Sequence, residues 1–254
     1  MSCTIPFFKK RSISYVFSKV RGLAAHTPQH VRGKTSHLVM CIDFVFYIRC
    51  SGILYRMLIV DVEASGTRCA QHSIVSIGAV DFNNPDNRFY EECRIWDGAE
   101  IMSGALEVNG FTEAQITDQS KQSEAHAVQK FLDWSHDVSD RTLTGQNPSF
   151  DRDFLREAAY RAHINWDFAY RTIDTHSLCW MHIIKRGNKP PVDATRKRSD
   201  LDLNAILRYC GIPNEPDPHN ALTGALCHAE VTSRMLFDRK LLPEFEHFDI
   251  PWLT

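Results

Sequence analysis

The sequence predicts an α/β fold in which a mixed sheet carries helices on both faces. Two patterns support this prediction: three apolar, strand-like runs follow one another after Met57, and helical and strand-like segments then alternate towards the end of the chain. A chain of 254 residues with 43% hydrophobic side chains is long enough for one domain with an appendage, or for two small domains at most.

The predicted strands are short apolar runs bounded by polar or turn residues. They cover residues 57–63, 73–82, 88–96, 141–144 and 170–173. The fourth run leads into Gly145-Gln146-Asn147-Pro148, which is typical of a strand that turns directly into a helix.

The predicted helices are segments in which apolar residues recur at helical spacing. They cover about 121–136, 150–162, 175–184, 201–209 and 219–238. Asp174 supplies an N-cap for the third helix, and Gly211 ends the fourth. Residues 187–199 contain Pro190-Pro191 and a basic run without periodicity, so we expect a basic loop between these two helices.

Residues 1–56 differ from the rest of the chain in charge. They contain nine Lys or Arg and one acid, Asp43, so their formal charge is +8, and the remainder of this chain of net charge −2 carries −10. We expect an extension upstream of a natural start at Met57, with a disordered basic tail or a targeting peptide as alternatives. Asp43 and Arg49 interrupt the apolar stretch 38–54, so no membrane span is expected. Unless residues 1–56 direct targeting, the expected location is cytoplasmic.

Composition also excludes some classes of site. The eight cysteines form no CxxC pair and no Cys–His spacing typical of zinc, and they suggest no disulfide framework. We expect most of them to be reduced and buried. Because residues 57–254 are acidic, any binding of nucleic acid must depend on metal ions and on local Lys or Arg clusters.

Asp61 and Glu63 stand at the end of the first predicted strand. Side chains two residues apart on a strand point to the same face, so the two carboxylates are expected side by side. Two such charges are costly together unless a cation lies between them, and hard divalent ions bind through carboxylate oxygens. An exposed acidic strand end is the ordinary alternative for an isolated pair of this kind.

Two further residues are candidate site residues because of their positions at the starts of predicted helices. Asp151 lies in the first turn of the helix that follows the fourth strand, where an acid also interacts favourably with the helix dipole. His219 follows Pro218 at the start of the last predicted helix, where a half-exposed histidine is unremarkable. Neither residue is decisive alone.

Together, and in this order, these residues resemble the ribonuclease T and DNA polymerase proofreading superfamily of 3'-5' exonucleases, in its histidine-containing branch. The resemblance covers residues 57 to about 242. Three motifs carry it: Asp61-Val62-Glu63-Ala64-Ser65-Gly66, Asn147-Pro148-Ser149-Phe150-Asp151 and Pro218-His219-Asn220-Ala221-Leu222. Smaller matches occur at 76–80, 109–112, 173–175 and 203–212.

The resemblance implies a ribonuclease H-like fold with a five-stranded mixed sheet flanked by helices. It implies an enzyme that hydrolyses phosphodiester bonds at the 3' end of single-stranded DNA or RNA, with two Mg²⁺ or Mn²⁺ ions held by Asp61, Glu63 and Asp151. His219 would be the general base. Members of this family are often dimers, so a homodimer is a further expectation.

The resemblance also implies residues that contact the substrate. The terminal nucleotide is expected to lie against Ala64, Ser65, Gly66 and Asn147. Phe111 either stacks on a base or packs in the core.

The sequence departs from the family at Gly224, where the usual motif has a fourth carboxylate five residues after the histidine. His228 lies one helical turn further on the same face, and helical side chains lean towards the N-terminus, so His228 is our candidate for the missing ligand. An imidazole ligand would shift preference from Mg²⁺ towards Mn²⁺. A hydrogen-bonded or solvent-facing histidine is the alternative.

The sequence leaves two questions open. The first question concerns activity. Because Gly224 replaces a carboxylate, the alternative function is a catalytically impaired module that binds nucleic acid or a protein partner. The second question concerns a dense basic cluster, which consists of Arg186, Lys189, Arg196, Lys197 and Arg198. These side chains either bind the phosphates of the substrate strand or lie on a solvated loop.

Overall fold

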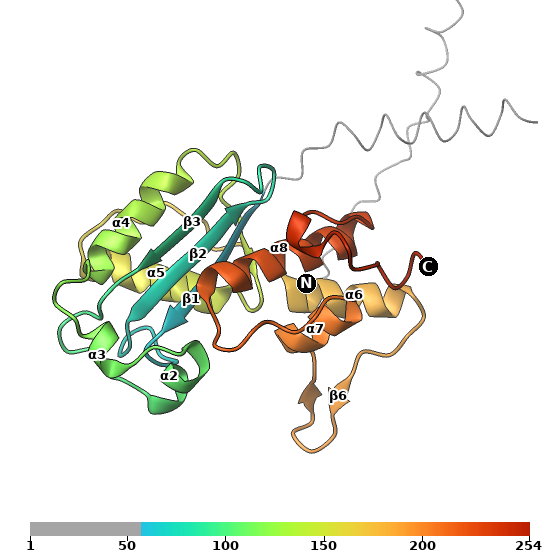
Figure 1. The fold of residues 1–254 in the computed structure, drawn as a ribbon, viewed down its shortest axis with the longest axis horizontal. Coiled ribbons are helices and arrows are strands. Elements are labelled where there is room, and N and C mark those ends of the chain that lie inside the picture. The colour runs from blue at the N-terminus through green and yellow to red at the C-terminus, as the bar shows by residue number, and fades with distance from the viewer. Residues whose placement is uncertain (1–56) are drawn as a thin grey trace, which may run out of the picture. The chain divides into compact units, whose positions relative to one another are not determined.

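The computed structural model describes residues 57–254, and the predictions made for residues 1–56 lie outside this range. A five-stranded sheet has the order β3-β2-β1-β4-β5 (Figure 1). Its strands are β1 (Leu58–Ala64), β2 (Ile74–Asp81), β3 (Arg88–Glu92), β4 (Leu143–Gly145) and β5 (Ile173–Asp174). The first three strands pair antiparallel, and β4 and β5 continue the sheet parallel to β1. The mixed five-stranded sheet is therefore confirmed.

Helices cover both faces of this sheet (Figure 1). α4 (Glu124–Ser135) and α5 (Ser149–Arg161) pack on the face that buries Leu58, Val60 and Val62 of β1. α8 (Ala221–Phe237) packs on the other face, where Ile59 joins Ala225 and Ala229. α6 (Thr175–Lys185) and α7 (Leu203–Tyr209) pack against α8 in a second apolar cluster.

Two features of the chain hold α8 in place. Gly78 of β2 has no side chain where the backbone of Ala221 lies, so the helix approaches the sheet closely. Near its other end, the fully buried Arg234 pairs with Glu230, with 2.7 Å between Nε and Oε1. Its remaining N–H groups donate to the backbone carbonyls of Cys210, Phe245, Phe248 and Asp249, which ties the C-terminal segment to the helix.

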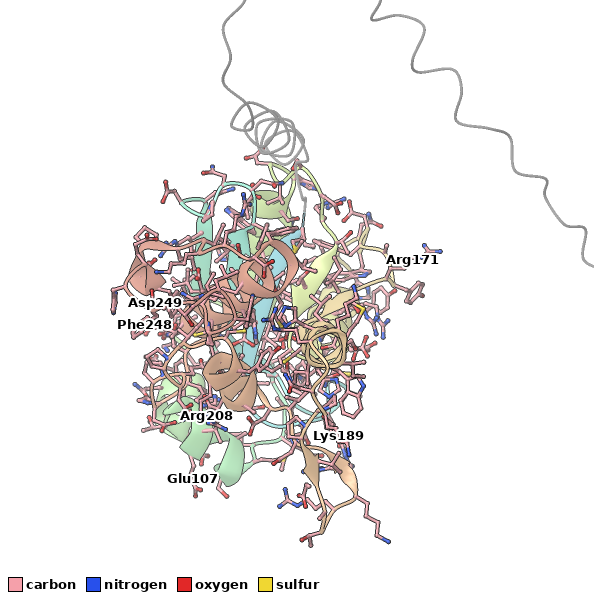
Figure 2. All side chains as sticks on the ribbon, turned by 90° about the vertical axis from the view of Figure 1, so that its right-hand side faces the viewer. Glu107, Arg171, Lys189, Arg208, Phe248 and Asp249 are labelled. Carbon is pink, nitrogen blue, oxygen red and sulfur yellow. The ribbon has the colours of Figure 1, made fainter. Side chains whose placement is uncertain are left out.

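The structure corrects the sequence prediction in three segments. α2 (Ser103–Asn109) and α3 (Glu113–Ile116) were not predicted, because both are short and mostly exposed and therefore lack an apolar periodicity. The predicted basic loop contains a small hairpin, β6 (Val192–Asp193) and β7 (Arg198–Ser199), whose turn places Lys197 at a φ of 52°. This hairpin projects from the domain, with Lys189 near its base (Figure 2). Within residues 57–254, no helix is long and apolar enough to cross a membrane.

Candidate active site

The alternation of β1 directs two carboxylates to the side of α8. Val60 and Val62 enter the core under α4 and α5, while Ile59 packs towards α8 on the opposite face. Asp61 and Glu63 follow Ile59 at intervals of two, so they share its face and line one cavity. The predicted pairing of these side chains is therefore present in the structure.

Asp151 reaches the same cavity from α5. The chain turns from β4 into this helix within four residues, and Asp151 lies in its first turn. Its Oδ1 accepts a hydrogen bond of 2.9 Å from the backbone N–H of Val62, between the two carboxylates of β1. This bond joins α5 to the strand and fixes the position of the Asp151 carboxylate.

His219 lies just before α8 rather than within it. Asn220 is the N-cap, and its side chain accepts from the backbone N–H groups of Leu222 and Thr223. The predicted start of the helix was therefore two residues early, because Asn220 satisfies the first free N–H groups itself. The His219 backbone N–H donates to the carbonyl of Val108 at 3.0 Å, which anchors the loop to α2.

One cavity of about 400 Å³ brings these residues together. Its titratable lining side chains are Asp61, Glu63, Asp151, Asp202, Glu215, His219 and His228. Elements far apart in the sequence therefore meet where the central strand β1 and its neighbour β4 end, and the cavity is rich in acids.

His228 is the residue that the sequence analysis proposed in place of the missing fourth ligand. It lies on α8, is 1% exposed, and places Nε2 at 3.4 Å from Oδ1 of Asp61. Its Nδ1 is buried without a hydrogen-bond partner among the described residues. The side chain thus borders the carboxylates, as its helical position led us to expect.

Glu215 is a residue that the sequence analysis missed. It follows α7 in a proline-rich loop, where no periodicity indicates which way a side chain points. The side chain is 4% exposed and places Oε2 at 3.8 Å from Nδ1 of His219. Its other oxygen, Oε1, is buried and has no hydrogen-bond partner among the described residues. Only the three-dimensional arrangement identifies it as part of the cavity.

The electrostatics reflect crowded acids. Burial, with a contribution from the charge of Glu215, raises the pKa of Asp61 well above its ordinary value. Burial and the neighbouring carboxylates raise the pKa of Glu63 to about 9. Burial, and then the charge of Asp61, raises the pKa of Asp151, and burial raises that of Glu215 as well. Burial lowers the pKa of His228, which favours a neutral imidazole.

This donor set suits a hard divalent cation. Within residues 57–254, no three His, Cys, Asp or Glu side chains lie close enough to ligate an ion as they stand. The cavity nevertheless presents carboxylate oxygens, the ligands that Mg²⁺ and Mn²⁺ prefer, and a positive charge between them would relieve their mutual repulsion. The buried, unpartnered oxygen of Glu215 adds to this fit.

The residues expected to contact the substrate lie in different environments. Ala64 and Gly66 line a side hollow of about 290 Å³ next to the main cavity, with Met102, Val108 and Phe150. Asn147 lines the main cavity with a φ of 52°.

Ser65 and Phe111 are less accessible. Ser65 is fully buried, donating from Oγ to the carbonyl of Glu100 and accepting from the N–H of Ser73. Phe111 packs against the cluster of Val75, Ile95 and Ile116, as the core alternative proposed.

Solved structures of other proteins share the fold of this chain. The chain is similar to Escherichia coli exonuclease I in complex with a 5cy-dT13 oligonucleotide, with a TM-score of 0.57 and 18% identity over 72% of this chain and 41% of that one. It is also similar to the zinc-bound form of an E. coli exonuclease I–single-stranded DNA complex, with a TM-score of 0.56 and 18% identity over 72% and 41% of the two chains. The chain thus spans about two fifths of exonuclease I.

A smaller protein is matched almost completely. The nuclease domain of 3'hExo, a DEDDh family member bound to rAMP, has a TM-score of 0.56 and 17% identity over 75% of this chain and 96% of that one. No curated protein matched the sequence. The ribonuclease H-like fold is therefore confirmed by structure.

The family follows from a sequence model. The model of the 3'-5' exoribonuclease Rv2179c-like domain matches residues 56–236, which contain all of the carboxylates and histidines described above. The chain thus belongs to the family of Rv2179c-like 3'-5' exoribonuclease domains.

Proposed function

We propose that the chain hydrolyses phosphodiester bonds one nucleotide at a time from the 3' end of single-stranded nucleic acid, in a reaction that depends on divalent ions. The observation that carries this proposal is the meeting of Asp61, Glu63, Asp151 and His219 in one cavity. Exonuclease I and 3'hExo, bound to a DNA oligonucleotide and to rAMP respectively, support a single-stranded substrate of either kind.

Asp61, Glu63 and Asp151 would hold two ions, Mg²⁺ or Mn²⁺. When bound, such ions activate water and stabilise negative charge on the phosphate oxygens during in-line displacement. The three carboxylates supply the negative charge and the oxygen ligands, and the Val62 N–H keeps Asp151 oriented. His228, next to Asp61, remains our proposed nitrogen ligand.

His219 would accept the proton of the attacking water. Its side chain is 32% exposed at the cavity, so water and the scissile phosphate both have access to it. Its loop is held by the Val108 carbonyl and by the Asn220 cap, so the ring is presented from a fixed backbone. An imidazole suits this task near neutral pH.

The side hollow is suited to the terminal base. Met102, Val108 and Phe150 give it apolar side chains, and Ala64 and Gly66 line it as well. Phe150 also lines the main cavity, so a base against this ring would leave its phosphate beside the carboxylates. Asn147 lines the main cavity beside Phe150.

The test is degradation of 5'-labelled single-stranded RNA and DNA of matched sequence, with Mg²⁺ or Mn²⁺. The wild type should give a ladder that shortens from the 3' end, and a blocked 3' terminus should prevent it. Asp61→Asn should lower the rate by more than about 100-fold, because it removes a carboxylate ligand. Asp97→Asn, at an exposed position outside the cavity, is the matched control.

Two results would count against the proposal. An undiminished rate in Asp61→Asn would remove the site assignment. Stabilisation of the wild type by the ions without any hydrolysis would favour the alternative of an impaired binding module.

A further inference from the structure

The fourth carboxylate of the site has no room at position 224. Because Gly78 lets α8 approach the sheet, the Asp61 carboxylate lies against the backbone of Gly224. A Cβ on Gly224 would collide with this carboxylate and lie 2.8 Å from its Cγ. An acid at this position would therefore require Asp61 to move.

Glu215 reaches the same place from another direction. Its Oε1 lies 3.4 Å from the position that a Cβ on Gly224 would occupy. The backbone N–H of Glu215 donates to Oδ1 of Asn204 at 3.0 Å, so α7 holds the loop that delivers the side chain. The Glu215 charge also acts on both Asp61 and Glu63, which shows that the three carboxylates share one environment.

The unpartnered oxygen of Glu215 indicates what is missing. A buried carboxylate oxygen normally accepts a hydrogen bond or ligates a cation, since burying it without either is costly. Oε1 of Glu215 does neither with any of the described residues, although the other oxygen lies near His219. A divalent ion beside Asp61 would supply the partner.

We propose that Glu215 is the fourth carboxylate ligand of the divalent ions and replaces the acid that the family motif has at position 224. This inference rests on the proposed function and deepens it. It also explains how Gly224 is compatible with an active enzyme: the ligand comes from the loop before His219 instead of from α8. The rival reading is that Glu215 only orients His219.

The decisive variant is Glu215→Gln, which keeps the side-chain volume and removes the charge. We expect Mn²⁺ affinity, measured by calorimetric titration of the purified full chain, to fall by at least about 10-fold, while Asp61→Asn abolishes binding at one or both sites. Glu107→Gln, the same change at an exposed position on α2 outside the cavity, should leave the affinity unchanged.

Rate measurements separate the two readings. If Glu215 is a ligand, high Mn²⁺ should restore much of the exonuclease rate of Glu215→Gln, because the weakened site fills. If Glu215 only orients His219, no ion concentration should restore it. In EDTA, Glu215→Gln should melt no earlier than the wild type, since it removes a buried negative charge that repels Asp61 and Glu63.

If Glu215→Gln binds Mn²⁺ with the affinity and stoichiometry of the wild type, Glu215 is not a ligand. If Asp61→Asn is inactive in the same assays, the proposed function stands and only the ligand role of Glu215 is refuted. If Mn²⁺ binding depends on Glu215 but the protein degrades no nucleic acid, the ligand assignment is supported and the proposed function is refuted.

A second variant tests the geometry from the other side. Gly224→Ala should weaken Mn²⁺ binding, because the added methyl group displaces the Asp61 carboxylate. Gly104→Ala is the matched control, since a Cβ there meets open space. Equal affinities in the two variants would contradict the crowding on which the assignment of Glu215 depends.

Discussion

Asp61 has two buried neighbours that approach it from opposite ends of the last motif. Glu215 precedes His219 by four residues, and His228 follows it by nine. Each has a buried polar atom without a hydrogen-bond partner among the described residues, Oε1 and Nδ1 respectively. The first offers an oxygen to a cation and the second a ring nitrogen, so their contributions should differ between metals.

His228→Ala should therefore weaken Mn²⁺ more than Mg²⁺, because imidazole favours transition metals over magnesium. Loss of a nitrogen ligand or of a close neighbour of Asp61 should cost about 10- to 100-fold in metal affinity. The measurement is the metal concentration that gives half-maximal exonuclease rate, for each ion. His126→Ala, at an exposed position on α4, is the control. Wild-type rates and metal preference in His228→Ala would eliminate the ligand role.

The β6–β7 hairpin is the element that most changes the interpretation of the basic segment. Its turn and the first residue of β7 carry Arg196, Lys197 and Arg198, all exposed, and the chain then enters α7, whose first residues line the cavity. Oγ of Ser199 lies 2.8 Å from Nε2 of His176 on α6, which anchors the base of the hairpin. Basic side chains are thus presented on a projecting, anchored arm.

Replacing Arg196, Lys197 and Arg198 together by Ala should raise KM for a long single strand and leave kcat nearly unchanged, since no atom of the arm belongs to the cavity. The dependence of log affinity on log salt should become shallower by up to about 2, at about 0.7 per lost phosphate contact. The measurements are steady-state kinetics and binding at several salt concentrations. Removing the exposed Arg171 and Arg239 is the control. An unchanged salt slope would indicate a solvated arm.

Periodic elements were predictable and the loop-borne features were not. The two-residue period of β1 and the helix that follows β4 predicted where Asp61, Glu63 and Asp151 lie, because each element has a buried face that fixes its register. Glu215 belongs to a loop whose course depends on the hydrogen bond between its backbone N–H and the side chain of Asn204 of α7. Such contacts join distant segments, so local sequence patterns carry no signal of them.

For the whole molecule, the crowded acids mean that the metal-free domain is destabilised by its own site. In the folded state Glu63 has a pKa of about 9 against an ordinary value of 4.5, and the pKa values of Asp61 and Asp151 are raised too. Between these values the folded protein binds more protons than the unfolded chain. The free energy of unfolding should therefore fall as pH rises through this range.

Urea denaturation in EDTA should show this loss of stability between about pH 5 and pH 9, whereas saturating Mg²⁺ should make the dependence shallower, because the ion replaces the protons. Glu63→Gln should flatten the profile in EDTA, since it removes one of the shifted groups. Stability that stays constant or rises over this range in EDTA would show that the carboxylates are not coupled to folding in this way.

The alternation of side chains along β1 makes one strand serve both the core and the cavity. The same seven-residue strand supplies Val60 and Val62 to the core and Asp61 and Glu63 to the cavity. Inserting or deleting one residue early in this strand would exchange the two faces, placing the carboxylates in the apolar core and the valines in the cavity. Such a change would disrupt the core and the cavity together. We therefore expect related chains to differ from this one in β1 by substitutions and not by insertions or deletions.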